Sequence, residues 1–439
     1  MNLASLPRTA VAVAVCAVLL AGCGGPSDPV AAGAHVPASA VVPASGVFDA
    51  SRVHSIAVTV DPSDYAAMVA AYERSQDKDW VHASVTIDGR TFSDVGLRLK
   101  GNLTLRTVDL DADPSAVPFL IRLDKFVDGQ EIDGYREFAV RYSTGSGLNE
   151  AVALDLLRAA GLASERAVAS RFSVNGSAET LRLVVQNPDD TWDAENFDSD
   201  GILYKAEARG DYSYRGTDPA AYEGVFDQEA GGSGGGTDNL DPLIGFLDFV
   251  NNSSDADFAA KLAERLDVDA FARYLALEAL IANGDDISGG GNNSYLRYDS
   301  ASTKFTVVAW DHNSAFGGGI GPGGAVGGGM GGGRGPGGDR NGLGPGGIGG
   351  PGGMGGRGGP GNRSNILERR FRAVPAFAAL VTAASAELRA SLYAGGAAQA
   401  ALEEWVDVLT EHAYDLVAAA DLTAEAARVS GYFGGAGTG

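Results

Sequence analysis

The sequence predicts an α+β protein with a sheet-rich first half and a mainly helical second half. Short runs of alternating apolar and polar residues, typical of half-buried strands, are frequent before Gly231. After Gly236, apolar residues instead recur at helical spacing. A third observation is the polar stretch 282–317, in which carboxylates and carboxamides stand at the ends of two short apolar runs.

The first residues have the composition of an export signal. Arg8 supplies a positive charge, and the apolar run 10–20 is too short to span a bilayer. This run ends Leu20-Ala21-Gly22-Cys23, which resembles the lipobox of bacterial lipoproteins. We therefore expect a signal peptide at 1–22, a lipid anchor to the membrane at Cys23, and a flexible tether at 23–46. The alternative is an ordinary secretory signal in which Cys23 occurs by chance.

Charge and cysteine content exclude several classes of function. The chain has 33 Lys and Arg against 56 Asp and Glu, which gives a net charge of −23. Such a surface repels nucleic acid, so no nucleic acid partner is expected. The two cysteines, Cys16 and Cys23, lie in the predicted leader and at its cleavage point. Thiol catalysis, cysteine metal sites and intramolecular disulfides are therefore not expected in the mature chain.

A sheet-rich N-terminal lobe is expected over 47–230. Asp61-Pro62-Ser63-Asp64 predicts the start of a helix at 65–74, and Asp88-Gly89 predicts a hairpin turn. An amphipathic helix interrupts the strands at 148–160 and ends at Gly161. The predicted strands are 53–60, 81–87, 91–99, 119–123, 137–141, 168–174, 181–185 and 202–205.

The C-terminal lobe is expected in two parts. Residues 237–316 carry the polar stretch, and residues 363–430 supply the closing helices of the same lobe. Between them, residues 317–362 are so rich in glycine that no core can be built from them, and we predict a disordered insertion. Asp267 or Asp269 is the expected N-cap of the third helix. The predicted helices are 243–250, 257–266, 270–282 and the one that carries the apolar stripe 402–416.

The polar stretch contains the hard oxygen ligands that hold Mg²⁺ beside a phosphate. Asp285 and Asp311 are spaced like a catalytic loop and a metal-binding strand end joined by a hairpin, and Asn292 or Asn293 offers a neutral ligand. Asp311 follows the apolar strand 305–309, so its carboxylate projects from a rigid scaffold. His312 beside it is expected to support the site by packing rather than to catalyse. On composition alone, the same stretch is also typical of a surface turn.

Several blocks in the same order resemble the CotH kinase family, whose members are secreted or spore-coat atypical protein kinases. The resemblance extends over roughly residues 50 to 420. The blocks are Gly96-Leu97-Arg98-Leu99-Lys100-Gly101-Asn102, residues 119–130, Gly201-Ile202-Leu203-Tyr204-Lys205, Asn283-Gly284-Asp285 with Asn292-Asn293-Ser294-Tyr295-Leu296, Val308-Ala309-Trp310-Asp311 through Ala315-Phe316-Gly317, and residues 367–377.

The resemblance implies an atypical protein-kinase-like bilobal fold and a role for each candidate residue. Asp285 is then the catalytic aspartate, and Asp311 holds Mg²⁺ or Mn²⁺ together with Asn293, which fits better than Asn292. Three cations are implied as ligands of the ATP phosphates, and Glu150, which opens the helix 148–160, is implied to orient one of them. The cations are Arg98, Lys100 and Lys205.

The resulting hypothesis is a lipid-anchored protein kinase at the outer side of a bacterial membrane, which transfers the γ-phosphate of ATP to an extracytoplasmic protein. The chain departs from the family pattern at 103–105, at 118–121, which lacks lysine, and at Gln186, where Glu is usual. The alternative is therefore a catalytically inactive member of the family that acts in cell-envelope binding or assembly. A third hypothesis is a cellulosome-like or Ca²⁺-dependent adhesion module. Residues 196–201 with Glu207 partly match an EF-hand Ca²⁺ loop, but no flanking helix pair is evident, and the same residues are typical of a turn leading into the strand 202–205.

Overall fold

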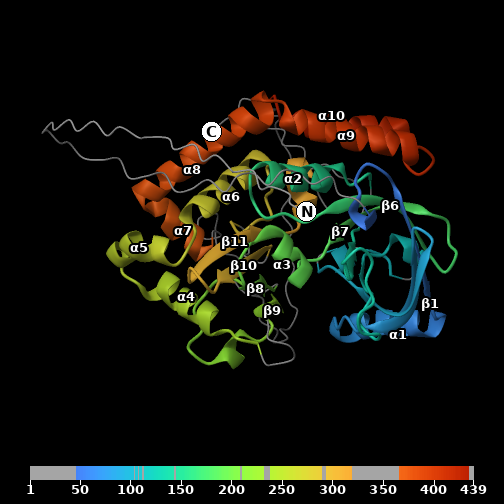
Figure 1. The fold of residues 1–439 in the computed structure, drawn as a ribbon, viewed down its shortest axis with the longest axis horizontal. Coiled ribbons are helices and arrows are strands. Elements are labelled where there is room, and N and C mark those ends of the chain that lie inside the picture. The colour runs from blue at the N-terminus through green and yellow to red at the C-terminus, as the bar shows by residue number, and fades with distance from the viewer. Residues whose placement is uncertain are drawn as a thin grey trace, which may run out of the picture. The chain divides into compact units, whose positions relative to one another are not determined.

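The computed structural model describes nine segments of the chain, which belong to one compact unit within Val42–Gly439 (Figure 1). The predicted signal peptide, Cys23, nearly all of the tether, Asn292 and most of the predicted glycine-rich insertion lie outside the described residues, so these predictions stay predictions. The described segments are 46–102, 104–106, 108–110, 113–142, 145–207, 210–231, 238–288, 293–318 and 365–434.

Seven strands of the first half close into a barrel, and the predicted α+β class is confirmed. The barrel closes because β1 pairs antiparallel with β2 and parallel with β6. Alternate residues of β1 are buried, which is the period of two that the sequence pattern predicted. In barrel order, the strands are β1 (His54–Val60), β2 (Val81–Ile87), β3 (Arg90–Leu99), β4 (Phe119–Arg122), β5 (Glu137–Val140), β7 (Thr180–Gln186) and β6 (Ala167–Val174).

Three α-helices accompany these strands. α1 (Pro62–Ser75) begins as predicted, because the side chain of Asp61 accepts a hydrogen bond from the backbone N–H of Ser63. α2 (Leu148–Ala159) is also as predicted and is buried along most of its length. α3 (Asp190–Asn196) was not predicted. Residues 196–201 run from α3 into a strand rather than between two helices, so the EF-hand interpretation is wrong.

A second sheet has the strand order β11-β10-β8-β9. The strand predicted at 202–205 belongs to this sheet, where β8 pairs antiparallel with β10. Arg297 of β10 connects this sheet to α3, since its Nε and Nη2 donate to the two carboxylate oxygens of Asp193 at 2.7 and 3.0 Å. The strands are β8 (Gly201–Ala206), β9 (Phe226–Ala230), β10 (Ser294–Asp299) and β11 (Lys304–Ala309).

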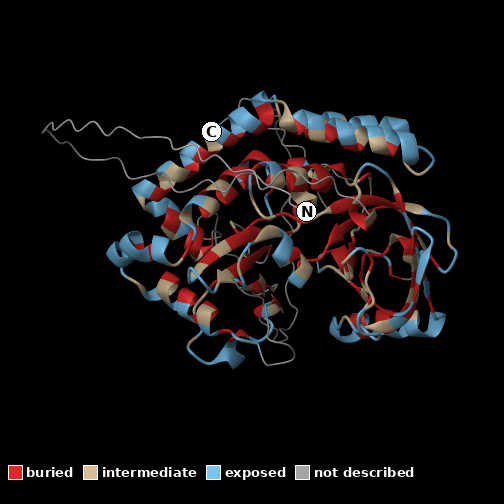
Figure 2. Ribbon diagram, in the orientation of Figure 1, coloured by how far each residue is buried: buried red, intermediate tan, exposed pale blue. Residues whose placement is uncertain are grey.

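The second half is mostly helical, as predicted. The side chain of Asp267 accepts from the backbone N–H of Ala270 at 2.9 Å, which confirms it as the N-cap of α6. Figure 2 shows α6 buried over most of its length, whereas α9 is exposed along one side. The helices are α4 (Asp241–Asn252), α5 (Asp255–Lys261), α6 (Val268–Leu280), α7 (Ile366–Ala373), α8 (Pro375–Leu388), α9 (Ala397–His412) and α10 (Ala419–Ser430).

The length and hydropathy of the described helices bear on whether they could span a membrane. None of them is long and apolar enough by itself to cross a bilayer. The segments Ile366–Ala373 and Pro375–Ala394 meet the criterion only when taken together, and they are bent by 98° relative to each other.

Candidate active site

Asp311 stands just beyond β11 in an unusual backbone conformation, with φ 64° and ψ 72°. Left-handed backbone is uncommon for residues other than glycine, although aspartate tolerates it better than most, and such residues concentrate at functional sites. The Asp311 side chain is 27% exposed, and its Oδ1 accepts a hydrogen bond from Nη2 of Arg141 at 2.8 Å. The carboxylate is therefore held in place while one side of it remains open to solvent.

Arg141 is the central cation of this arrangement, and the sequence patterns did not point to it. It follows β5 directly, and its Nε donates to Oε1 and Oε2 of Glu150 at 2.9 and 3.0 Å. Glu150 lies in the first turn of α2 and is only 3% exposed. Burial disfavours the charge of Arg141, but the carboxylates of Asp311 and Glu150 outweigh it and raise the pKa of Arg141. One guanidinium thus connects the barrel, α2 and the end of β11.

This contact changes the partner expected for Glu150. The family resemblance implied one of the cations Arg98, Lys100 and Lys205, whereas the structure pairs Glu150 with Arg141. The signal that could have identified Arg141 is its place at the end of the predicted strand 137–141, shortly before the helix that begins with Glu150.

Asp285 lies in the turn that follows α6, and it is exposed. Partial burial and the nearby carboxylate of Asp311 raise the pKa of Asp285, while a hydrogen bond from Asn293 opposes the shift. Asn293 also donates through Nδ2 to the backbone oxygen of Asp285 at 2.7 Å. The structure therefore brings Asp285, Asp311 and Asn293 together, as the sequence spacing suggested.

These side chains fit a Mg²⁺ or Mn²⁺ ion bound next to a phosphate. Within the described segments, no group of three or more His, Cys, Asp or Glu side chains is gathered as a metal site of its own. Mg²⁺ beside a phosphate commonly takes only one or two carboxylates, with water and phosphate oxygens as its other ligands. Burial, and after it the repulsion from Asp311, raises the pKa of Asp285, and this repulsion would be relieved by a bound cation. Asp311 and Asn293 are the residues that would hold it.

The predicted phosphate-binding cations also come together. Arg98 and Lys100 lie at the end of β3, and Lys205 lies on β8. Burial, followed by the positive charges of Lys205, Arg141 and Arg98, lowers the pKa of Lys100 to about 7, although the carboxylate of Glu229 opposes the shift. Positive charges gathered so closely repel one another, and an anion among them relieves that repulsion.

Two carboxylates and one further lysine belong to this cluster. Nζ of Lys205 lies 2.7 Å from Glu207 Oε1 and 3.7 Å from Glu229 Oε1. Lys78, in the connection between α1 and β2, has a pKa that burial and then the charge of Lys205 lower. Nothing in the sequence pattern around Lys78 had marked it as a site residue.

A buried pair lies behind Asp311. His312 is fully buried, and its Nε2 lies 3.0 Å from Oε1 of Glu278 on α6. Burial disfavours the charged imidazole, but Glu278 outweighs it and raises the pKa of His312. The pair ties the residue after Asp311 to the helix that leads into Asp285, which is the supporting role the sequence suggested.

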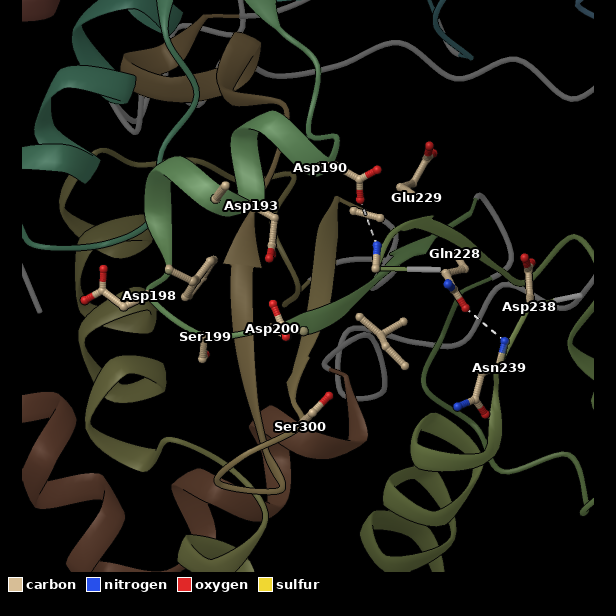
Figure 3. A pocket seen from close by; sticks show the side chains of 16 residues that line it. Asp190, Asp193, Asp198, Ser199, Asp200, Gln228, Glu229, Asp238, Asn239 and Ser300 are labelled. Atoms are coloured by element: carbon tan, nitrogen blue, oxygen red, sulfur yellow. Dashed lines mark hydrogen bonds between the residues drawn. The ribbon is translucent and has the colours of Figure 1, made fainter. Parts of the chain in front are cut away.

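A cavity of about 1140 Å³ opens beside β8, β9 and α3 (Figure 3). Its lining is strongly acidic. Asp193 accepts a hydrogen bond from Arg297, and Asp190 accepts one from the backbone N–H of Gly231. An acidic lining repels phosphate, so this cavity is not the place of the predicted phosphate site. It adjoins that site through Glu229, which lines the cavity and pairs with Lys205.

The comparisons with known proteins bear on these residues. A family model described as CotH kinase protein matches residues 97–415. The matched range includes all of the predicted site residues, and α1 and β2 lie before it. Comparison with curated proteins yields no significant match.

Proposed function

The chain belongs to the CotH kinase family, and from this premise we propose that it is a protein kinase that transfers the γ-phosphate of ATP to a protein outside the cytoplasm. In this proposal the chain is held at the outer face of a bacterial membrane by a lipid on Cys23. The barrel and α2 act as the nucleotide lobe of a bilobal, kinase-like arrangement, and the lobe around α6 carries the catalytic carboxylate.

The observation that supports the proposal best is the meeting of opposite charges around Arg141. Phosphoryl transfer requires a carboxylate for the attacking hydroxyl, oxygen ligands for a metal, and cations for the phosphates. In protein kinases a helix glutamate and a metal-binding aspartate must both be in place for activity. Here Arg141 contacts Glu150 of α2 and Asp311 at once, and its charge also reaches Lys100.

Each residue then has a role that follows from its chemistry. Asp285 accepts the proton of the substrate hydroxyl while the hydroxyl oxygen bonds to the γ-phosphorus and the bond between that phosphorus and ADP breaks. The raised pKa of Asp285 makes its carboxylate a better base. Arg98, Lys100 and Lys205 bind the phosphate oxygens and orient them. A Mg²⁺ or Mn²⁺ ion held by Asp311 and Asn293 supplies charge neutralisation at the phosphates.

Transfer of labelled phosphate from ATP by the full mature chain tests the proposal. With Mg²⁺ or Mn²⁺ present, we expect autophosphorylation or labelling of an added protein. We expect at least a loss of about 10²-fold in Asp285→Asn and in Asp311→Asn, since each removes a group used in the transition state. A folded wild type that transfers no phosphate and shows no ATP-dependent change in melting temperature would overturn it.

One observation favours a second candidate, a catalytically inactive family member that binds partners at the cell envelope. Arg141 already occupies Oδ1 of Asp311, the carboxylate that the kinase proposal assigns to the metal. If that pairing persists with metal and ATP present, Asp311 is a structural residue. Titration of Mn²⁺ into wild type and Asp311→Asn distinguishes the two candidates, because equal affinity supports the inactive protein.

A further inference from the structure

We propose that Trp80 and Trp310 are positioning residues, which hold Arg98 and Lys100 ready for the phosphate chain of a nucleoside triphosphate. The inference rests on the proposed nucleotide site, and it assigns a role to two aromatic rings that carry no charge of their own. The inference is based on a difference between the cations of the site, since some are paired with carboxylates and others lie against indole rings.

Two cations of the cluster are paired with carboxylates. Arg141 binds Glu150 and Asp311, and Lys205 lies next to Glu207. Such contacts position a cation, but they also neutralise it and occupy its N–H donors. Arg141 and Lys205 are therefore only partly available to an added anion.

Arg98 and Lys100 are held differently. Across the described segments, no ion pair is found for either residue, and Nζ of Lys100 donates to the neutral side-chain oxygen of Asn187 at 3.0 Å. Nε of Arg98 is buried without a hydrogen-bond partner. A buried donor without an acceptor is costly, and an arriving phosphate oxygen removes that cost.

The contacts that position these two cations are with indole rings. Cζ of Arg98 lies 4.7 Å from the ring centroid of Trp80, and Nζ of Lys100 lies 5.1 Å from that of Trp310. Both distances are within the range of cation–π attraction. Each ring also faces a second cation, Lys125 at Trp80 and Arg141 at Trp310. An aromatic face attracts a cation without cancelling its charge and leaves its N–H groups free for an anion.

The surrounding structure fixes both rings. Trp310 is 6% exposed and meets Tyr295 edge-on, with centroids 5.6 Å apart and planes at 89°. Trp80 lies against β3 at Gly96, where an added Cβ would come within 2.8 Å of Cε3 of Trp80. The absence of a side chain at Gly96 therefore lets the ring reach Arg98. Trp80 lies outside the matched range 97–415, so the family match by itself gives no reason to include it.

Binding of inorganic triphosphate to the full mature chain, measured by calorimetry without metal, tests the inference. Trp80→Leu and Trp310→Leu should each weaken binding about tenfold, and the corresponding Phe variants should recover most of the loss. Arg98→Met should reproduce Trp80→Leu, whereas Lys125→Met, which removes the other cation on the same ring, should stay within about twofold. Trp405→Phe, on α9, is the control for the loss of an indole elsewhere.

A second measurement separates attraction by the ring from simple packing. Tryptophan with increasing numbers of fluorine atoms, placed at position 80 or 310, weakens the negative ring face at nearly constant shape. A stepwise loss of triphosphate affinity supports the inference, and a flat series overturns it, as do Leu variants with wild-type affinity. If the folded wild type binds neither triphosphate nor ATP, the proposed kinase function falls together with it. If the wild type binds and the ring variants do not differ, only the inference on the tryptophans fails.

Discussion

Asp311 and Asp285 are the two carboxylates of the candidate site, and the chain holds them in opposite ways. Asp311 lies just beyond β11, adopts a left-handed backbone conformation and accepts a hydrogen bond from Arg141. The buried His312–Glu278 pair lies directly behind it. Asp285 lies in the turn after α6 and is exposed. Its surroundings raise its pKa, so they disfavour the ionised carboxylate.

The difference shows where the chain provides rigidity. In the proposed function Asp311 holds a metal, and such a ligand benefits from being positioned in advance. Asp311 lies two residues beyond the end of β11 and accepts a hydrogen bond from the charged side chain of Arg141. In the proposed function Asp285 receives a proton from a protein substrate, which requires that its carboxylate remain accessible, and Asp285 is exposed. Four predictions test this contrast, from the largest expected effect to the smallest.

Arg141→Met should destabilise the fold most, because it leaves Glu150 as a buried charge without its cation. Loss of one partner of a buried pair costs about 3–5 kcal/mol, measured here as the free energy of unfolding in urea. Arg141→Lys keeps the charge but loses the forked geometry, so an intermediate loss is expected. A loss below about 1 kcal/mol in the Met variant would show that the Asp311 side is not the rigid one.

Lys100, on the Asp311 side of the site, should make anion binding depend on pH. With its pKa lowered to about 7, it loses its charge above that pH, and triphosphate binding should weaken by up to about tenfold per pH unit. Without ligand, the folding stability depends on pH in the opposite direction to binding. The folded state releases the Lys100 proton at lower pH than the unfolded state does, so stability rises from about pH 7 towards 10.5, the ordinary pKa of lysine. Calorimetry from about pH 6 to about pH 9 checks this. Lys100→Met should remove this pH dependence of triphosphate binding. Parallel pH profiles for the wild type and Lys100→Met would contradict the prediction.

Asp267→Ala should weaken the helix that leads into Asp285. The Asp267 side chain accepts from Ala270 N–H at the start of α6, and loss of such a cap costs about 1 kcal/mol. Asp269→Ala, two residues further on, is the matched control, with an expected change within about 0.5 kcal/mol. Chemical denaturation measures both variants. Equal losses would mean that the cap is not what stabilises this end of α6.

Asp285→Asn should have the smallest effect on stability, and in the opposite direction. The folded state raises the pKa of Asp285, so the ionised carboxylate opposes folding at pH values above its unfolded pKa. Asn removes that charge, and at pH 7 stability should be unchanged or higher, within about 0.5 kcal/mol because the group is exposed. The gain should vanish below about pH 4, where the unfolded carboxyl is also protonated. Asp311→Asn should instead be destabilising, and similar results for the two variants would remove the contrast.

Local patterns were enough to predict most of the secondary structure. The strand predicted at 81–87 coincides with β2, and Asp267 caps α6 as expected, because alternation and capping depend on neighbouring residues. The helices α3, α8 and α10 and the strand β9 were missed. α3 and β9 are short, and the many alanines of α8 and α10 give no clear stripe. The spacing of Asp285, Asn293 and Asp311 along one hairpin also predicted that they would meet.

The rest of the site depends on pairings that no local pattern contains. Arg141 reaches Asp311 across a separation of 170 residues, and only the folded chain brings the two together. Lys205 lies on β8 in the second sheet, yet its charge acts on Lys100, which follows β3 of the barrel. The stacking of Trp80 on Arg98 depends on the contact between the connection after α1 and β3.

The parallel pairing of β1 with β6 and the pairing of β8 with β10 join segments that lie far apart in the sequence. β1 has no partner on one side until β6 has been made, and β8 lacks β10 until the polar hairpin has been made. Pairings between segments so far apart in sequence are slow to form, because a long loop must close before they stabilise anything. The hairpin of β10 and β11 can form from neighbouring residues, but the contact of Arg141 with Asp311 spans 170 residues and requires that the long loop between them has closed.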